Sequence, residues 1–224
     1  MGNFFKKVCL LCMAGSLMLC AFSCGKKHEH ENVVTADQYG DATQEELPYG
    51  ATIKQIKSGG SDDDKITVEF DHRFVTDEEA QKILSYIEAL NTGNEELLKQ
   101  TVYPDYLSYL CTNSDIADVK TYIQQITDRI KTNYTNGEDF KFGYIFINSC
   151  TTSDEDSQSF GQADTILEEI GGDELMAKIT SRKMVQVDSM YTLTGSGESF
   201  SLASQAGQEQ PFYLYTIDGE VFIV

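Results

Sequence analysis

The chain opens with an apolar stretch unlike any later part of it. Residues 8–23 contain no charged side chain, and residues 1–7 carry Lys6 and Lys7 and no acid. A positive start followed by an apolar run is the pattern of a secretory signal peptide. The run is also shorter than the ~20 residues that a membrane-spanning helix needs. We therefore predict an export signal over residues 1–23.

The next stretch, residues 24–47, is polar and has no periodicity, which is typical of a flexible tether. Short alternating patterns then predict strands at residues 51–56 and 66–70, separated by a loop rich in Gly, Ser and Asp. We expect a single folded domain over residues 48–224 that begins with extended structure.

A series of helices follows, marked by apolar residues three and four positions apart. The first has a capping box at Thr76 and Glu79, whose side chains satisfy backbone amides at a helix start, and Gly93 ends it. Two short helices come next, the second opened by Pro104. Another is predicted over residues 115–132, because a clear apolar stripe is formed by Ile116, Val119, Ile123, Ile126 and Ile130.

Beyond residue 136 the pattern changes to a period of two. It predicts a strand over residues 140–147, with one face formed by Phe140, Phe142, Tyr144 and Phe146. Residues 166–179 look helical, although Gly171 and Gly172 interrupt them. Further strands are predicted at residues 184–193, 200–203, 212–217 and 221–223, the last two joined by an Asp218-Gly219 hairpin turn. Helices followed by an antiparallel sheet indicate the α+β class.

Charge limits the partners that this chain can have. Its 224 residues include 36 acidic and 17 basic side chains, a net charge of −19, and removal of the predicted signal peptide makes it more acidic still. Such a chain repels phosphate backbones, so we expect no nucleic-acid partner. It also repels an anionic membrane surface, so membrane attachment needs another source.

That source is indicated by Cys24. The preceding residues are Ala21-Phe22-Ser23, with small side chains at the minus-three and minus-one positions, and the segment resembles the lipobox of bacterial lipoproteins. The usual leucine three residues before the cysteine is Ala21 here. The resemblance implies cleavage before Cys24, a diacylglyceryl group on it, and a location on the extracytoplasmic face of the cell membrane. Two acyl chains are enough for stable anchoring.

Other segments resemble a superfamily of small α+β domains. Residues 87–97, followed by Val102-Tyr103-Pro104, look like the helical opening of the nuclear-transport-factor-2-like, or cystatin-like, superfamily, and residues 217–223 resemble its last strand pair. The resemblance implies N-terminal helices packed on a curved antiparallel sheet, a cone with a pocket at its mouth. Members include isomerases, dehydratases, binding domains and dimerisation modules. Residues 47–52 are also similar to uncharacterised lipoproteins of anaerobic Gram-positive bacteria.

Candidate chemistry in the domain is sparse. His72 is its single histidine. It could act as a base in such a pocket, but its place just before a capped helix is typical of a solvent-exposed junction residue. No Ser-His-Asp, phosphate-loop, dinucleotide or zinc-finger pattern is present, so we expect no catalytic residue, metal or cofactor. Cys111 and Cys150 could form a disulfide outside the cell or remain buried thiols.

Three acidic or histidine-containing motifs could hold a cation. Residues 28–31, His-Glu-His-Glu, could bind a metal ion but lie in the tether, where nothing fixes their geometry. Residues 62–64 and 154–156 are acidic triplets that could bind calcium. The second fails the EF-hand spacing, because Ser159 and Thr165 stand where Gly and Glu are needed. We interpret all three as solvated segments.

Tyr103, Tyr106 and Tyr109 recur at intervals of three on one predicted helix. They could form a binding face for an envelope protein or a small ligand, or pack in the core with their hydroxyls at the surface. The sequence as a whole favours a non-catalytic, lipid-anchored binding module, in which cone mouths could pair in a homodimer. The alternative is an isomerase- or dehydratase-type enzyme that uses the same pocket.

Overall fold

Strands β1 (Ile53–Lys57) and β2 (Thr67–Asp71) form an antiparallel pair at the start of the domain, as predicted. The structure is a computed structural model that describes residues 47–59 and 65–224. Cys24, the histidine motif at residues 28–31 and the acidic triplet at residues 62–64 therefore lie outside the described residues.

The predicted helices follow β2. They are α2 (Asp77–Thr92), α3 (Glu95–Thr101), α4 (Pro104–Asn113) and α5 (Val119–Tyr134). The capping box of α2 is confirmed, because Glu79 N donates to Thr76 Oγ1 at 3.2 Å and Thr76 N donates to Glu79 Oε2 at 2.8 Å. Gly93, with a φ of 67°, ends this helix.

Helix α5 begins later than the sequence predicted. The expected start was residue 115, but Asp115 has a φ of 54°, which is not helical. The cap is Asp118, whose Oδ1 accepts from Thr121 N at 2.7 Å. Ile116 is buried although it lies outside the helix. The apolar spacing therefore located the helix, whereas its first turn was wrong.

The remaining strands complete a single seven-stranded sheet. They are β3 (Phe140–Thr152), β4 (Ile179–Leu193), β5 (Ser199–Ser201), β6 (Gln210–Ile217) and β7 (Glu220–Ile223). The order is β1-β2-β3-β4-β6-β7, with β5 also paired to β4. The predicted hairpin turn is confirmed, with positive φ angles of 52° at Asp218 and 84° at Gly219.

One pairing corrects the expected antiparallel sheet. β2 and β3 are parallel, with Val68 paired to Ile145, whereas all other strand pairs of the sheet are antiparallel. Helices α2 to α5 separate the two strands in sequence, and a connection of that kind returns the chain in the same direction. The sheet is therefore mixed.

Strand β3 does not keep one face throughout its length. A register shift lies between Phe142 and Tyr144, so that Gly143 is the extra residue of a bulge. The buried residues are Phe142 before the bulge and Ile145 and Ile147 after it. The prediction that Phe142 and Tyr144 share a face is therefore wrong, because the extra residue reverses the alternation.

The helices between and after the long strands also differ in detail from the prediction. The 3-10 helix η5 (Ser157–Phe160) precedes α6 (Gly161–Met176), and Gly172 breaks the second half of α6 with a φ of 59° and a ψ of −159°. The strand expected at residues 200–203 is β5 followed by helix α7 (Leu202–Ala206). This helix forms because Ser201 Oγ accepts from Ser204 N at 2.9 Å and caps its start.

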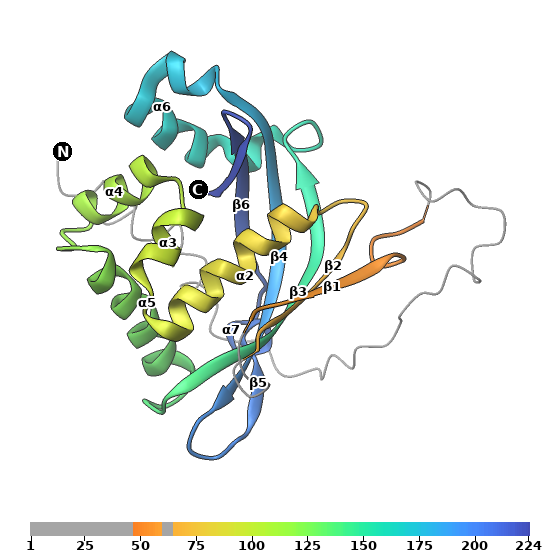
Figure 1. The fold of residues 1–224 in the computed structure, drawn as a ribbon, viewed down its shortest axis with the longest axis vertical. Coiled ribbons are helices and arrows are strands. Elements are labelled where there is room, and N and C mark those ends of the chain that lie inside the picture. Colours follow the sequence, from red (N-terminus) through yellow and green to blue (C-terminus); the bar gives the residue numbers. More distant parts are fainter. Residues whose placement is uncertain (1–46, 60–64) are drawn as a thin grey trace.

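The sheet is curved and not closed. Figure 1 shows α3, α4 and α5 gathered on one side of the sheet, with α2 crossing in front of it. Helix α2 contacts β1, β2 and β3 as well as β7. The space between helix and sheet is filled by buried side chains, which include Phe70, Ile83, Leu84, Ile145, Val187, Leu214 and Ile223. The α+β class is confirmed.

Candidate functional site

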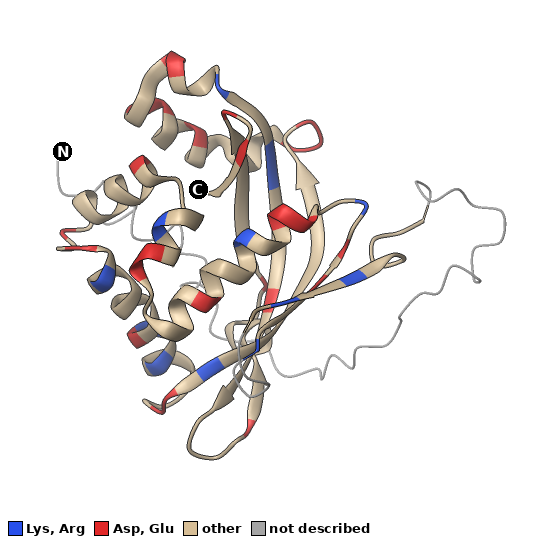
Figure 2. Cartoon of the chain, in the orientation of Figure 1, with Lys and Arg blue, Asp and Glu red and all other residues tan. Residues whose placement is uncertain are grey.

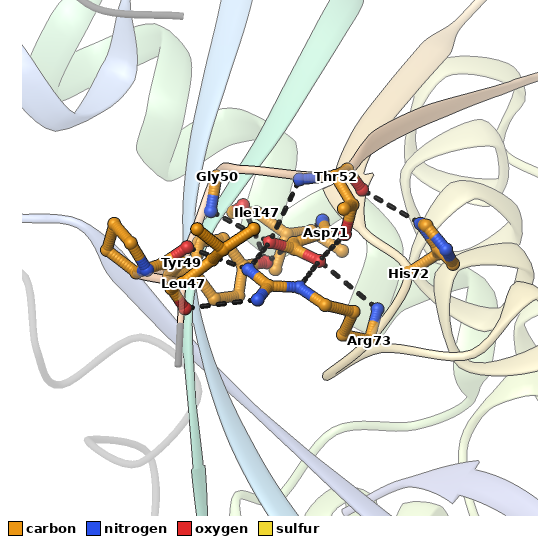
Figure 3. Close-up of polar contacts among 9 residues, drawn as sticks. Leu47, Tyr49, Gly50, Thr52, Asp71, His72, Arg73 and Ile147 are labelled. Carbon is orange, nitrogen blue, oxygen red and sulfur yellow. Dashed lines mark hydrogen bonds and ion pairs between the residues drawn. The ribbon is translucent and has the colours of Figure 1, made fainter. Parts of the chain in front are cut away.

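A dense cluster of polar contacts lies where the domain begins. Asp71 ends β2 and its side chain is completely buried. Its carboxylate accepts from Gly50 N at 2.9 Å and from Thr52 Oγ1 at 2.6 Å. Arg73 supplies two further donors, Nε at 3.0 Å from Oδ1 and Nη2 at 2.6 Å from Oδ2 (Figure 3). Every side of this carboxylate is therefore occupied.

Arg73 also binds the main chain ahead of β1. Its Nη1 donates to Leu47 O at 3.0 Å and its Nη2 donates to Pro48 O at 2.7 Å. The guanidinium carbon lies 4.9 Å from the centre of the Phe74 ring, within cation–π range. We call residues 47–52 the strap and the pair Asp71 and Arg73 the junction clamp. The clamp holds both ends of the strap.

Tyr49 connects the strap to β3. Its ring stacks on Phe74 with centroids 5.2 Å apart. Its hydroxyl donates to Ile147 O at 2.9 Å and accepts from Asp71 N at 3.4 Å. Leu47, at the first described position, is 7% exposed. The strap is thus packed on the sheet from its first residue.

The electrostatics of the clamp suit a group that holds the strap in place. They do not suit proton transfer. Burial alone would raise the pKa of the Asp71 carboxyl, but hydrogen bonds from Arg73, Thr52 and Gly50 outweigh burial and hold that pKa well below 3.8. Burial raises the pKa of the Tyr49 hydroxyl above 10.0. Asp71 is therefore ionised and Tyr49 neutral at neutral pH, and neither exchanges a proton there.

A second cluster joins the clamp to the start of α2. Lys183 Nζ on β4 donates to Glu79 Oε2 and to Phe74 O, both at 2.9 Å. Cys150 Sγ lies 3.7 Å from the same carbonyl oxygen. Burial raises the pKa of the Cys150 thiol to about 11, so it is protonated at neutral pH. The junction clamp and this second cluster therefore connect the strap, α2, β3 and β4.

The two domain cysteines are not joined. Cys111 on α4 and Cys150 on β3 are both free thiols, so the disulfide considered from the sequence is not formed in this structure. Burial raises the pKa of Cys111 as well. Both thiols are half-buried, and the alternative of unpaired thiols describes them.

His72 lies beside the clamp without joining it. Its side chain is exposed, and Nδ1 is 2.9 Å from Thr52 O (Figure 3). This contact fixes the ring to the strap backbone. This is the exposed junction position predicted from the sequence.

Tyr103, which caps α4, and Tyr106 and Tyr109 within that helix do not form one face. Tyr103 is half-buried, with its ring edge-to-face on Phe222 at 5.5 Å. Tyr106 is 2% exposed and belongs to the core. Tyr109 donates its hydroxyl to Glu169 Oε2 at 2.9 Å. Tyr106 is therefore a core residue and does not share an exposed face with Tyr103 and Tyr109.

One buried tyrosine does meet a carboxylate, as an acid–base site would require. Tyr215 Oη donates to Asp164 Oδ1 at 3.0 Å, and Arg182 Nε donates to the same oxygen at 2.9 Å. Tyr215 is fully buried, and burial followed by the nearby charge of Asp164 raises its pKa above 10.0. The carboxylate oxygen is already shared by two donors, so the pair joins α6 to the sheet instead of presenting a base.

The acidic residues are dispersed over the described helices, strands and loops (Figure 2). Of the triplet at residues 154–156, Glu155 Oε2 accepts from Thr152 N at 2.7 Å and Asp156 caps η5. Within residues 47–59 and 65–224, no group of three or more His, Cys, Asp or Glu side chains is placed to hold a metal ion. A surface depression near the start of β3 is lined by Glu138, Asp139, Thr194, Gly195 and Ser196.

Comparisons with known proteins give no relative from which the role of the site could be inferred. No family model, curated protein or solved structure matches this chain. In the described part of the chain, no helix has the length and apolar content needed to cross a membrane.

The sequence did not single out the residues of the clamp. The signal was present in Asp71-His72-Arg73, at the end of a predicted strand, but by residue type the histidine between the two partners is the stronger candidate for chemistry. Gly50 and Thr52 belong to the strap. The similarity of this segment to lipoprotein sequences does not predict what its residues contact. Asp71 therefore emerges as the centre of the site only once β1 and β2 are paired.

Proposed function

We propose that this chain is a lipid-anchored protein of the bacterial cell envelope, located on the extracytoplasmic face of the membrane. Residues 1–23 direct export, Cys24 carries the lipid, and residues 24–47 are the tether. The domain that follows binds an envelope protein or a small ligand and catalyses no reaction. Pairing of two domains in a homodimer belongs to the same proposal.

The junction clamp is the observation that best supports this proposal. A tether acts on a domain at the point where the two join, and Leu47 is the first described residue at that point. The ion pair of Asp71 and Arg73 fixes that point, since Arg73 donates to Leu47 O and Pro48 O while Asp71 accepts from Gly50 and Thr52. A buried, two-point Arg–carboxylate pair suits this role because its geometry is directional as well as attractive.

The arrangement of α2 supports a finer assignment of fold. The helix contacts both β1 and β7, which are the two edges of the curved sheet. A sheet wrapped around one helix is what the nuclear-transport-factor-2-like resemblance implies, and we propose that the domain is a variant of that cone with a parallel β2–β3 pair. The Asp71 carboxylate, whose oxygens are engaged by Gly50, Thr52 and Arg73, supports the binding role over an isomerase or dehydratase.

Lipid attachment is tested by metabolic labelling with a fatty-acid analogue. We expect the wild-type chain and a Cys20→Ala control to be labelled in the membrane fraction, since Cys20 leaves with the signal peptide. The Cys24→Ala chain should carry no label and should keep its uncleaved leader. Label retained by Cys24→Ala would contradict the proposal.

A further inference from the structure

The strap reaches the sheet where strands β2 and β3 stop pairing with each other. Their parallel ladder ends at the pair Glu69 and Phe146. Beyond this pair the Tyr49 hydroxyl joins the two strands, because it accepts from Asp71 N at 3.4 Å and donates to Ile147 O at 2.9 Å (Figure 3). A side chain of the strap therefore bridges the two backbones beyond the end of their own pairing.

Phe74 connects this bridge to a thiol. Its ring stacks on the ring of Tyr49, with centroids 5.2 Å apart and planes inclined by 29°. Its carbonyl oxygen accepts from Lys183 Nζ at 2.9 Å and lies 3.7 Å from Cys150 Sγ. Phe74 thus contacts the strap with its ring and the thiol with its backbone.

Cys150 projects from the sheet close to the place where Tyr49 is attached. It comes three residues after Ile147 on β3, and a register shift falls within this interval. Cys150 pairs with Val185 and Ile147 with Val187, and side chains two apart on a strand share a face. Both valines are at most 1% exposed, so this is the buried face. Cys150 and Ile147 therefore lie on the side of the sheet that faces the core.

The electrostatics of the two side chains agree with this placement. Burial is the main reason for the raised pKa of the Tyr49 hydroxyl, and the charge of a Cys150 thiolate acts in the same direction. Burial is also the main cause that raises the pKa of Cys150 to about 11, although Lys183 acts against it. The pKa of Cys111, on α4, is raised by burial and by Asp118. Cys111 therefore serves as an internal reference outside the strap.

The strap is attached to the domain mainly through side chains. It contributes no strand to the sheet, and one backbone contact, from His72 N to Thr52 O at 3.2 Å, lies at its last residue. The junction clamp and Tyr49 hold the rest of it. A surface segment held by a few contacts can open locally while the remainder of a protein stays folded. Opening of the strap would move the Tyr49 ring away from Phe74 and expose Cys150.

We propose that the strap is a releasable cover for the thiol of Cys150. While the junction clamp is intact, Tyr49 and Phe74 shield the thiol from solvent. A partner that displaces the strap thereby makes the thiol accessible. This switch goes beyond the proposed function, because it is a property of the folded domain and does not depend on lipid at Cys24.

The test follows the reaction of each cysteine with N-ethylmaleimide in the full chain, and peptide mass spectrometry separates Cys150 from Cys111. Tyr49→Ala removes the ring and the hydroxyl that cover the thiol. Arg73→Lys keeps the charge and loosens the strap. Tyr134→Ala is the matched control, since Tyr134 is also half-buried but lies at the end of α5.

We expect Cys150 to react about tenfold faster in both strap variants than in the wild type and the control, because relief of burial restores its thiolate. A fall of its pKa from about 11 to the ordinary 9.0 increases the thiolate fraction about a hundredfold, while the nucleophilicity of the less basic thiolate falls about tenfold. Cys111 should react at the same rate in all four proteins.

Two results would overturn the inference. One is an unchanged Cys150 rate in Tyr49→Ala, and the other is an equal rise at Cys111, which would mean that the whole domain had loosened. Circular dichroism and a thermal melt show whether each variant is folded. Tyr49→Phe is a milder variant that keeps the ring and loses the hydroxyl contacts, so its Cys150 rate should lie between those of wild type and Tyr49→Ala. The labelling of Cys24 is a separate readout, so a negative result here would leave the proposed membrane attachment standing.

Discussion

The guanidinium of Arg73 meets the carboxylate of Asp71 at two points, although only one residue separates them in the chain. The pair is largely out of solvent, with side-chain exposures of 11% for Arg73 and 0% for Asp71. An ion pair in such a place stabilises the fold only while both partners are present, because either charge alone would be buried without compensation.

Replacement of Asp71 by Asn should destabilise the domain strongly. The variant leaves Arg73 without its counter-ion and weakens the contacts to Gly50 and Thr52. We expect the free energy of unfolding to fall by about 3 kcal/mol, as for other buried pairs that lose one partner. Urea denaturation followed by circular dichroism measures this. The control is Lys99→Ala, which removes an exposed pair with Glu96 and should change nothing measurable.

Arg73→Lys should loosen the strap more than it destabilises the domain. Lysine keeps the positive charge but lacks the planar fork, so it cannot bind Asp71 at two points while donating to Leu47 O and Pro48 O. We expect faster cleavage within residues 47–52 in limited proteolysis, with the remainder of the domain resistant. Arg129→Lys, on α5, should leave the cleavage rate unchanged. Equal cleavage of all three proteins would show that the clamp does not hold the strap.

The clamp should also shape the response to acid. The folded pKa of Asp71 is lowered below its ordinary value of 3.8, so on acidification the unfolded chain takes up this proton first. The stability that Asp71 contributes is therefore present in full above about pH 5 and is lost as the pH falls through the ordinary value toward the lower folded one.

The stability difference between wild type and Asp71→Asn should thus stay constant from about pH 6 to about pH 5 and narrow from there toward about pH 3. Asp118, Glu155 and Asp156 also have lowered pKa values because of hydrogen bonds, but they are common to both proteins and cancel in the difference. Urea titrations at each pH give the comparison. A stability difference that stays constant over this range would rule out Asp71 as the titrating group.

Gly172 should tolerate no side chain. Its φ of 59° and ψ of −159° lie in a region that is essentially restricted to glycine, and a substitution there costs about 1–3 kcal/mol. Gly161, at the start of α6, has a helical φ of −54° and open space around it. We expect Gly172→Ala to lower the melting temperature and Gly161→Ala to hold or raise it. Differential scanning calorimetry of the two variants decides the matter.

Local signals in the sequence were sufficient for much of the fold. Thr76 and Glu79 predicted the start of α2, and Asp218-Gly219 predicted the last hairpin, because both motifs act over a few residues. The start of α5 was misplaced because Asp115 and Asp118 are equally good caps by residue type. The two residues differ in backbone conformation, because Asp115 is left-handed, and residue type does not predict this difference.

The remaining errors concern relationships between distant residues. The bulge at Gly143 is fixed by the register of β3 on β4. The presence of a glycine does not by itself predict a bulge. The contacts of Asp71 with Gly50 and Thr52 span 21 and 19 residues and depend on how β1 aligns with β2. Tertiary packing decides both.

The parallel pairing of β2 with β3 sets the order in which the chain can fold. A hairpin of β1 and β2 alone is marginally stable, because two strands bury too little surface. Their sheet neighbour β3 comes after α2, α3, α4 and α5 in the sequence, and such long-range pairing is slow compared with helix formation. The strap precedes all of these elements in the sequence, yet it becomes fixed among the last, when β3 supplies the carbonyl that Tyr49 binds.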